Sequence, residues 1–274
     1  MRWLNSITFA VMEFFNKIKK VVLVIEYNGR SYRGFQWQKG APTVQDELEK
    51  AIHKLTGENR RVLAACRTDA GVHAKGQVCC FRTSSRLGPL KFLDGLNHYL
   101  PDDISVKGTG FTSERFNVMK DAIRREYRYR IFNRRTRSPL ASEFHFMVRK
   151  QLDTGLMDEA SKLLIGEHDF ASFVTDWDRE GGTVRRIYEA GVNREEEEVT
   201  FHVIANAFLT HQVRNIVGTL IKVGTGKIGI EEFKNILELK QLSLAGPSAP
   251  AHGLCLIKVI YADYSEFKYE NLCT

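Results

Sequence analysis

The order of strand-like and helix-like segments constrains the fold of this 274-residue chain more than any other feature of its sequence. A β-branched run at 21–27 ends at the turn signal Asn28-Gly29. The helix-like segment that follows can be capped by Thr43 and ended by Gly57. Further strand-like runs lie at 60–66, 76–82 and 104–111, and a second helix-like run lies at 89–99. The first half therefore predicts strands and helices in one α+β arrangement.

The second half of the chain repeats this alternation. Its strand-like segment at 125–133 places two tyrosines and an isoleucine on one face and two arginines and a phenylalanine on the other. We expect a turn at Asn193-Arg194 and a loop entering a short helix at 166–173. Helix-like runs lie at 154–164, 208–224 and 230–238, and strand-like runs at 185–192, 198–207 and 254–261. The whole chain predicts an α+β fold with a mixed, mostly antiparallel sheet.

The chain divides into four expected segments. They are an N-terminal extension at 1–16, an N-terminal α+β subdomain at 17–120, a C-terminal α+β subdomain at 121–265 and a tail at 266–274. The apolar stretch in the extension is too short to span a bilayer and has no signal-peptidase site after it. The five cysteines contain no C-x-x-C pair, which favours reduced thiols. We therefore expect a soluble, cytoplasmic protein with no membrane partner.

The charge of the chain suits a polyanionic partner. The net charge is +7 and the pI is about 9.1, but this balance fits nucleic acid, an anionic membrane or a phosphorylated substrate equally well. The segment 124–137 is more specific, because seven arginines there are interleaved with Tyr127, Tyr129 and Phe132. Guanidinium groups bind phosphates and aromatic faces stack on bases, so the segment favours RNA over a sheet edge that arginines keep soluble.

Two other kinds of site are disfavoured. The stretch GTGKIG at 224–229 lacks the Lys-Ser or Lys-Thr pair and the first glycine of a phosphate-binding loop. None of the eight histidines pairs at H-x-x-x-H spacing with a carboxylate, so core or surface roles are favoured over zinc. We expect neither a nucleotide cofactor nor a metal.

Asp69 follows a strand-like run and lies in a turn between Arg67 and Gly71. By local pattern alone it is an ordinary turn aspartate. The surrounding string CRTDAGVHAKGQV (66–78), however, resembles the pseudouridine synthases that modify the tRNA anticodon stem-loop. Five other segments resemble the same family in the same order: EYNGRSYRGFQWQ (26–38), RREYRYRIFN (124–133), GEHDFASF (166–173), ANAFLTHQVRNIVGTLIKVGTG (205–226) and PAHGLCLIKVIY (250–261).

The resemblance implies a fold of two similar α+β subdomains that share a central sheet, with a cleft between them. It also implies that Asp69 is the nucleophile, that Tyr127 lies against the target base and that Arg214 pairs with the Asp69 carboxylate. We add the hypothesis that Arg67 fills the gap left by a flipped base. Arg124, Arg125 and Arg128 are expected to contact substrate.

The activity that the resemblance implies is isomerisation of uridine to pseudouridine at tRNA positions 38, 39 or 40, without a cofactor and by a homodimer. The carboxylate can attack C6 of the base or remove a ribose proton, and the sequence leaves both routes open. Either route needs the target base outside the helical stack. Two alternatives remain at this point: a non-catalytic module that binds or folds tRNA, and a synthase for another RNA.

Overall fold

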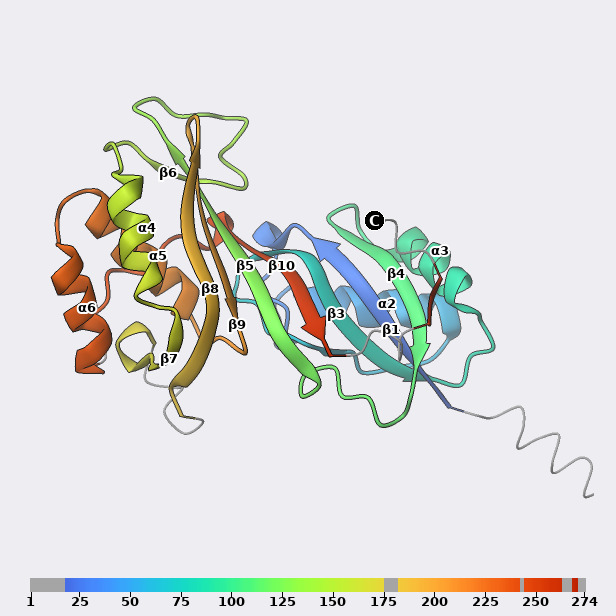
Figure 1. Cartoon of the computed structure of the whole chain (residues 1–274). Helices are drawn as coiled ribbons and strands as arrows, with labels where there is room; N and C mark the ends of the chain where they lie inside the picture. Colours follow the sequence, from blue (N-terminus) through green and yellow to red (C-terminus); the bar gives the residue numbers. More distant parts are fainter. Residues whose placement is uncertain (1–17, 175–181, 242–243, 263–267, 271–274) are drawn as a thin grey trace, which may run out of the picture.

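One continuous sheet runs through the computed structural model of the protein (Figure 1). The structure describes residues 18–174, 182–241, 244–262 and 268–270. Within these residues eleven strands form the sheet, in the order β11-β4-β1-β3-β10-β5-β9-β8-β7, with β2 beside β3 and β6 beside β5. The strands are β1 (Lys19–Tyr27), β2 (Leu63–Ala64), β3 (His73–Thr83), β4 (Ile104–Thr112), β5 (Ala122–Asn133), β6 (Phe146–Val148), β7 (Gly166–Asp169), β8 (Val184–Glu195), β9 (Glu198–Ala205), β10 (Leu254–Tyr261) and β11 (Lys268–Glu270).

Most neighbouring strands are antiparallel. The parallel pairs are β10 with β3 and β5 with β6. The β10 strand comes from the end of the chain, yet it lies between β3 of the first half and β5 of the second. The sheet is therefore mixed and mostly antiparallel, as the sequence predicted. Because the sheet is continuous, the subdomain boundary between residues 120 and 121 stays a prediction.

The helices lie near the two ends of the sheet (Figure 1). They are α2 (Val44–Thr56), α3 (Pro89–Tyr99), α4 (Thr154–Lys162), α5 (Gln212–Gly224) and α6 (Ile230–Leu239). The first two lie side by side near β4, and the other three lie together beside β8 and β7. Among the helices that the structure describes, none is long and apolar enough to cross a membrane.

Local sequence patterns correctly predicted where several elements begin or end. The Thr43 hydroxyl accepts the Asp46 amide proton at the start of α2, and Gly57 ends that helix in the left-handed region at φ 75°. The predicted bounds of α3 match the structure. In β5 the buried positions include Tyr127 and Tyr129, whereas Arg128 is exposed, as the alternation predicted.

Other element bounds were wrong. Of the predicted strand at 60–66, only β2 forms, because the Gln77 side chain takes the place of a strand partner at Cys66. The predicted loop at 166–173 begins with strand β7, which pairs with β8. The turn after β8 lies at Glu196 and Glu197 rather than at Asn193-Arg194.

The predictions for the two ends of the chain have different outcomes. Lys268–Glu270, predicted as part of a tail, form β11 and pair with β4. The predicted extension at 1–16 lies outside the described residues.

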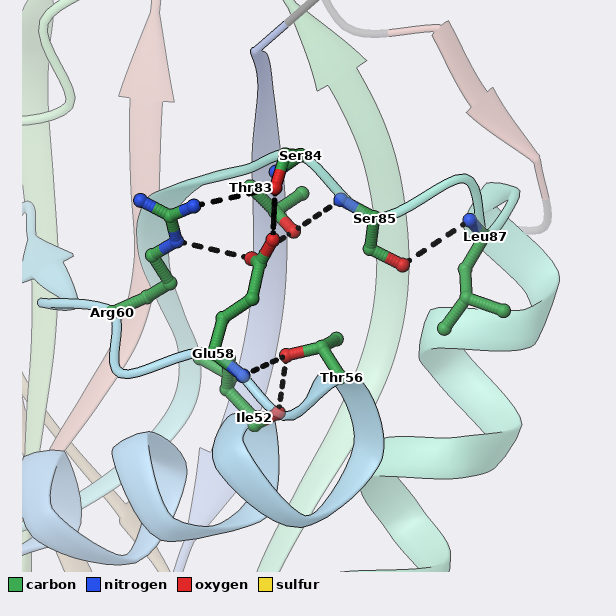
Figure 2. A network of polar contacts seen from close by, with 8 residues as sticks. All are labelled: Ile52, Thr56, Glu58, Arg60, Thr83, Ser84, Ser85 and Leu87. Atoms are coloured by element: carbon green, nitrogen blue, oxygen red, sulfur yellow. Dashed lines mark hydrogen bonds and ion pairs between the residues drawn. The ribbon is translucent and has the colours of Figure 1, made fainter. Parts of the chain in front are cut away.

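A carboxylate ties the end of α2 to the end of β3 (Figure 2). Glu58 accepts hydrogen bonds from Arg60 Nε at 3.0 Å, from Thr83 Oγ1 at 2.5 Å, from the Ser84 amide at 3.0 Å and from the Ser84 hydroxyl. Burial alone would raise the pKa of this carboxyl, but the hydrogen bonds from Arg60, Ser84 and Thr83 outweigh it and lower the pKa to about 2. The ionised form of Glu58 therefore stabilises the fold.

This network gives Glu58→Gln a testable effect on stability. We expect the free energy of unfolding at pH 7 to fall by about 1–3 kcal/mol, because charge-assisted hydrogen bonds are lost. The ordinary pKa of the carboxyl is 4.5 and its folded value is about 2. The contribution is thus complete above pH 4.5 and is lost as the pH falls toward 2.

Urea unfolding at pH 7 and at pH 3 measures this effect. The difference in free energy of unfolding between wild type and Glu58→Gln should be smaller at pH 3 than at pH 7. Glu238→Gln, at an exposed position of α6, is the control and should change stability by less than about 0.5 kcal/mol. A stability difference that is absent at pH 7, or that does not change with pH, would contradict the stabilising role of ionised Glu58.

Candidate active site

A cavity of about 750 Å³ opens where the two halves of the sheet meet. Its lining comes from the loop before β3, from β5 and from the segment that leads into α5. Asp69, Tyr127 and Arg214 all line it, although the first and last are 145 residues apart in the sequence. Arg33, Arg67 and Arg185 add positive charge to its walls. The three residues singled out by the resemblance therefore lie in one basic cavity.

The loop that carries Asp69 is held by its own backbone and by β1. The Asp69 carbonyl accepts the Val72 amide proton at 3.1 Å, which closes a tight turn. The buried Tyr27 hydroxyl and Thr68 Oγ1 are 2.7 Å apart, and the Thr68 carbonyl accepts the Phe35 amide proton at 3.1 Å. These contacts fix the residue on the N-terminal side of Asp69.

Two glycines let the segment after β1 lie against this loop. At Gly29 an added Cβ would be 1.9 Å from the Val72 carbonyl oxygen. At Gly34, where φ is 94°, a Cβ would be 2.7 Å from the Thr68 carbonyl oxygen. Any side chain at either position would displace the Asp69 loop, so the glycines are needed for close backbone approach.

Arg214 lies in the first turn of α5 and reaches Asp69. Its Nη1 donates to Asp69 Oδ2 at 3.3 Å, and its Nε donates to the Ala249 carbonyl at 2.7 Å. The second bond anchors the guanidinium on the backbone before β10, so its position does not depend on Asp69 alone. The positive end of the α5 dipole acts in the same direction as the guanidinium. Both place positive charge beside the Asp69 carboxylate, the kind of group that can act as a nucleophile.

Tyr127 forms part of the cavity wall from the middle of β5. The side chain is buried, and its ring meets that of Phe208 edge-on at 5.2 Å between centroids. Burial raises the pKa of its hydroxyl well above the ordinary value, and nearby Cys66, Tyr27 and Asp69 act in the same direction. Tyr127 therefore keeps its phenolic proton and can donate a hydrogen bond.

The four arginines expected to contact substrate have separate surroundings. Arg67 is exposed at the cavity, two residues before Asp69. Arg125 also lines the cavity, but it is buried and donates to the carbonyls of Met119, Ala122 and Asn206. Its guanidinium thus connects the start of β5 to the end of β9.

Arg124 and Arg128 are not among the residues that line this cavity. They alternate with Tyr127 along β5 and so project from the opposite face of the sheet. Arg124 lies over the ring of Tyr188 at 4.4 Å, and Arg128 pairs with Glu126 at 3.0 Å. The structure therefore does not bring these two arginines together with Asp69.

Two histidines, His73 at the start of β3 and His211 before α5, were expected only in core or surface roles. His73 is buried; its Nδ1 accepts the Gly29 amide proton at 3.1 Å, and its Nε2 lies 3.1 Å from the His252 carbonyl. Burial lowers the pKa of this ring. His211 Nε2 lies 3.5 Å from Asp69 Oδ2. The available signal for His211 was its position three residues before Arg214, which puts both in the same helical turn.

The family described as tRNA pseudouridine synthase matches residues 23–112 and 160–262. A solved structure described as "Structure of H/ACA RNP bound to a substrate RNA containing 2'-deoxyuridine" is similar at a TM-score of 0.35 and 12% identity, covering 78% of this chain and 46% of that one. That likeness is too weak to support an assignment.

Curated relatives match over most of their length. The tRNA pseudouridine synthase A of Roseiflexus sp. (strain RS-1) is 44% identical over 250 residues, which cover 90% of this chain and 92% of the relative. That of Thermoanaerobacter sp. (strain X514) is 40% identical, covering 89% and 100%, and that of Francisella tularensis subsp. novicida is 38% identical, covering 90% and 96%. The chain belongs to the tRNA pseudouridine synthase family.

Proposed function

We propose that this protein isomerises uridine to pseudouridine at positions 38, 39 or 40 of the tRNA anticodon stem-loop. The observation that carries the proposal is the meeting of Asp69, Arg214 and Tyr127 in one basic cavity. Family membership and the curated names of the relatives support tRNA as the substrate. The choice of the anticodon stem-loop rests on the sequence resemblance.

The cavity suits a nucleotide that has left the helix. At about 750 Å³ it falls within the usual range for small-molecule sites, about 300–1,000 Å³. A base inside a helix hides the atoms that must react, so the enzyme has to extrude it. The flat ring of Tyr127 offers a surface for the extruded uracil, and its retained proton offers a hydrogen bond.

The chemistry requires one bond to break and another to form. The N1–C1′ bond of uridine breaks, the uracil rotates, and C5 bonds to C1′ while the C5 proton leaves and N1 gains a proton. Asp69 either attacks C6 or removes a ribose proton, and it is regenerated at the end of the reaction. Arg214 lies beside the carboxylate with which the reaction begins and to which it returns. No oxidant, reductant or group donor is needed for this balance.

Arg67 is suited to occupy the space that the extruded base leaves in the RNA stack. Its side chain is exposed, and it forms no hydrogen bond among the residues that the structure describes. We expect Arg67→Ala to lower turnover on folded tRNA about 10-fold or more, and to change turnover on a flexible uridine-bearing oligomer much less. Parallel kinetics on the two substrates measure the difference, with exposed Arg115→Ala as control. Equal losses of turnover on both substrates would contradict this role of Arg67.

The proposal extends to the assembly and location of the protein. We propose a homodimer that grips tRNA across both subunits, and residence in the cytoplasm with tRNA as partner. The net charge of +7 supports binding to a polyanion. Analytical ultracentrifugation with and without tRNA measures the stoichiometry.

The substrate assignment is tested on unmodified tRNA transcripts. After incubation with the protein, carbodiimide labelling maps pseudouridine along each transcript. We expect modification at positions 38, 39 or 40. Modification elsewhere would identify a synthase for another site or RNA, and tRNA binding without any pseudouridine would identify a non-catalytic RNA-binding module.

A further inference from the structure

His211 approaches the same carboxylate oxygen as Arg214. The His211 Nε2 is 3.5 Å from Asp69 Oδ2, and the Arg214 Nη1 is 3.3 Å from that oxygen. His211 is the N-cap residue of α5, and Arg214 lies in the first turn of the helix. One rigid element thus presents two nitrogen atoms to one oxygen of Asp69.

The other oxygen of Asp69 has different surroundings. Among the residues described, Oδ1 accepts no hydrogen bond, and both contacts of the carboxylate go to Oδ2. We propose that His211 is a positioning residue which, together with Arg214, fixes Oδ2 so that Oδ1 is the atom that reacts with the uridine. This inference rests on the proposed function.

A second contact can matter because the carboxylate group of an aspartate rotates easily about its last side-chain torsion. The last torsion of an aspartate side chain has a broad energy minimum, so one contact at 3.3 Å leaves both oxygens free to exchange places. Two nitrogen atoms close to one oxygen restrict this rotation. Alignment of the reacting atoms contributes strongly to rate, and a misplacement of about 1 Å can cost about 100-fold. Active-site contacts of this length commonly shorten when substrate closes the site.

The helix end does not by itself require a histidine at this position. His211 has φ 60°, in the left-handed region, which histidine tolerates but glycine adopts at lower cost. Its side chain makes no capping hydrogen bond to α5 and contacts Asp69 instead. The ring therefore does not cap the helix, and the contact with Asp69 is what it supplies.

Three substitutions separate the ring from the backbone. His211→Gly removes the side chain and relaxes the positive φ. His211→Asn also tolerates this φ, but its amide ends where the ring Nδ1 lies and is too short to replace Nε2. His211→Gln carries an amide nitrogen at about the reach of Nε2. His53→Asn, at an exposed position of α2, is the matched control.

The measurement is single-turnover kinetics on a tRNA transcript over a range of enzyme concentrations. We expect His211→Gly and His211→Asn to lower the maximal rate about 10- to 100-fold while half-saturation changes less than about 2-fold. His211→Gln should recover part of the rate, and His53→Asn should match wild type. Thermal unfolding should show that the glycine and asparagine variants are folded.

The outcomes distinguish this inference from the proposed function. A maximal rate that is unchanged in His211→Gly would overturn the positioning role, as would a loss confined to half-saturation, which would identify His211 as an RNA contact. Equal losses in the glutamine, asparagine and glycine variants would also count against a role for the Nε2 contact. If wild type makes no pseudouridine, the proposed function itself fails.

Discussion

Asp69→Asn is expected to lower the rate of pseudouridine formation at least about 10⁴-fold while leaving tRNA affinity within about 3-fold of wild type. An amide of nearly the same shape cannot act as a nucleophile or accept a ribose proton. The substitution removes a negative charge beside Arg214, so binding to a polyanion should not weaken. The loop should keep its shape, because its anchors are Thr68 and the backbone.

Single-turnover assays and filter binding on the same tRNA transcript measure the two quantities. Asp94→Asn, on the exposed face of α3, is the matched control and should retain full activity. Residual turnover of Asp69→Asn above about 1% of wild type would show that another group performs the chemistry. If tRNA affinity fell as much as turnover, the carboxylate would have a structural role instead.

Arg214→Lys should have the second largest effect, a loss of about 10²- to 10³-fold in turnover, comparable to removing one preorganised donor from an active site. Arginine uses Nε for the Ala249 carbonyl and Nη1 for Asp69, and these two atoms belong to one planar group. The single ammonium of lysine cannot hold both positions. The charge is kept, so a large loss would show that geometry, and not charge alone, matters.

The assay is the same, with the temperature of unfolding measured beside it. Arg115→Lys, at an exposed position, should behave as wild type. We expect the maximal rate of Arg214→Lys to fall more than its tRNA affinity. A variant that retains more than half of wild-type turnover would contradict the pairing of Arg214 with Asp69 as a feature of the mechanism.

Local patterns predicted what depends on neighbouring residues. The cap at Thr43, the left-handed end at Gly57 and the two faces of β5 each follow from interactions within a few residues. The alternation in β5 also implied that Arg128 and Tyr127 face opposite ways. Composition alone suggested that Arg128 and Tyr127 share one RNA-binding surface. In the structure they lie on opposite faces of the sheet.

Features that depend on distant backbone could not be predicted in this way. Arg125 looked like a phosphate ligand, yet its guanidinium binds the nearby carbonyls of Met119 and Ala122 and that of Asn206, which only the fold brings close. The approach of Arg214 to Asp69 joins α5 to a loop 145 residues earlier, and it was expected only from resemblance. His211 gave no signal in isolation, because its relevance depends on that same approach.

A structure of Asp69→Asn bound to a tRNA anticodon stem-loop tests the role of the cavity most directly. We predict that the target uridine lies outside the stack and inside the cavity, with its ring against Tyr127 and with C6 or C1′ nearest the side chain at position 69. RNA bound to the opposite face of the sheet, along Arg124 and Arg128, with every uridine still stacked, would contradict it.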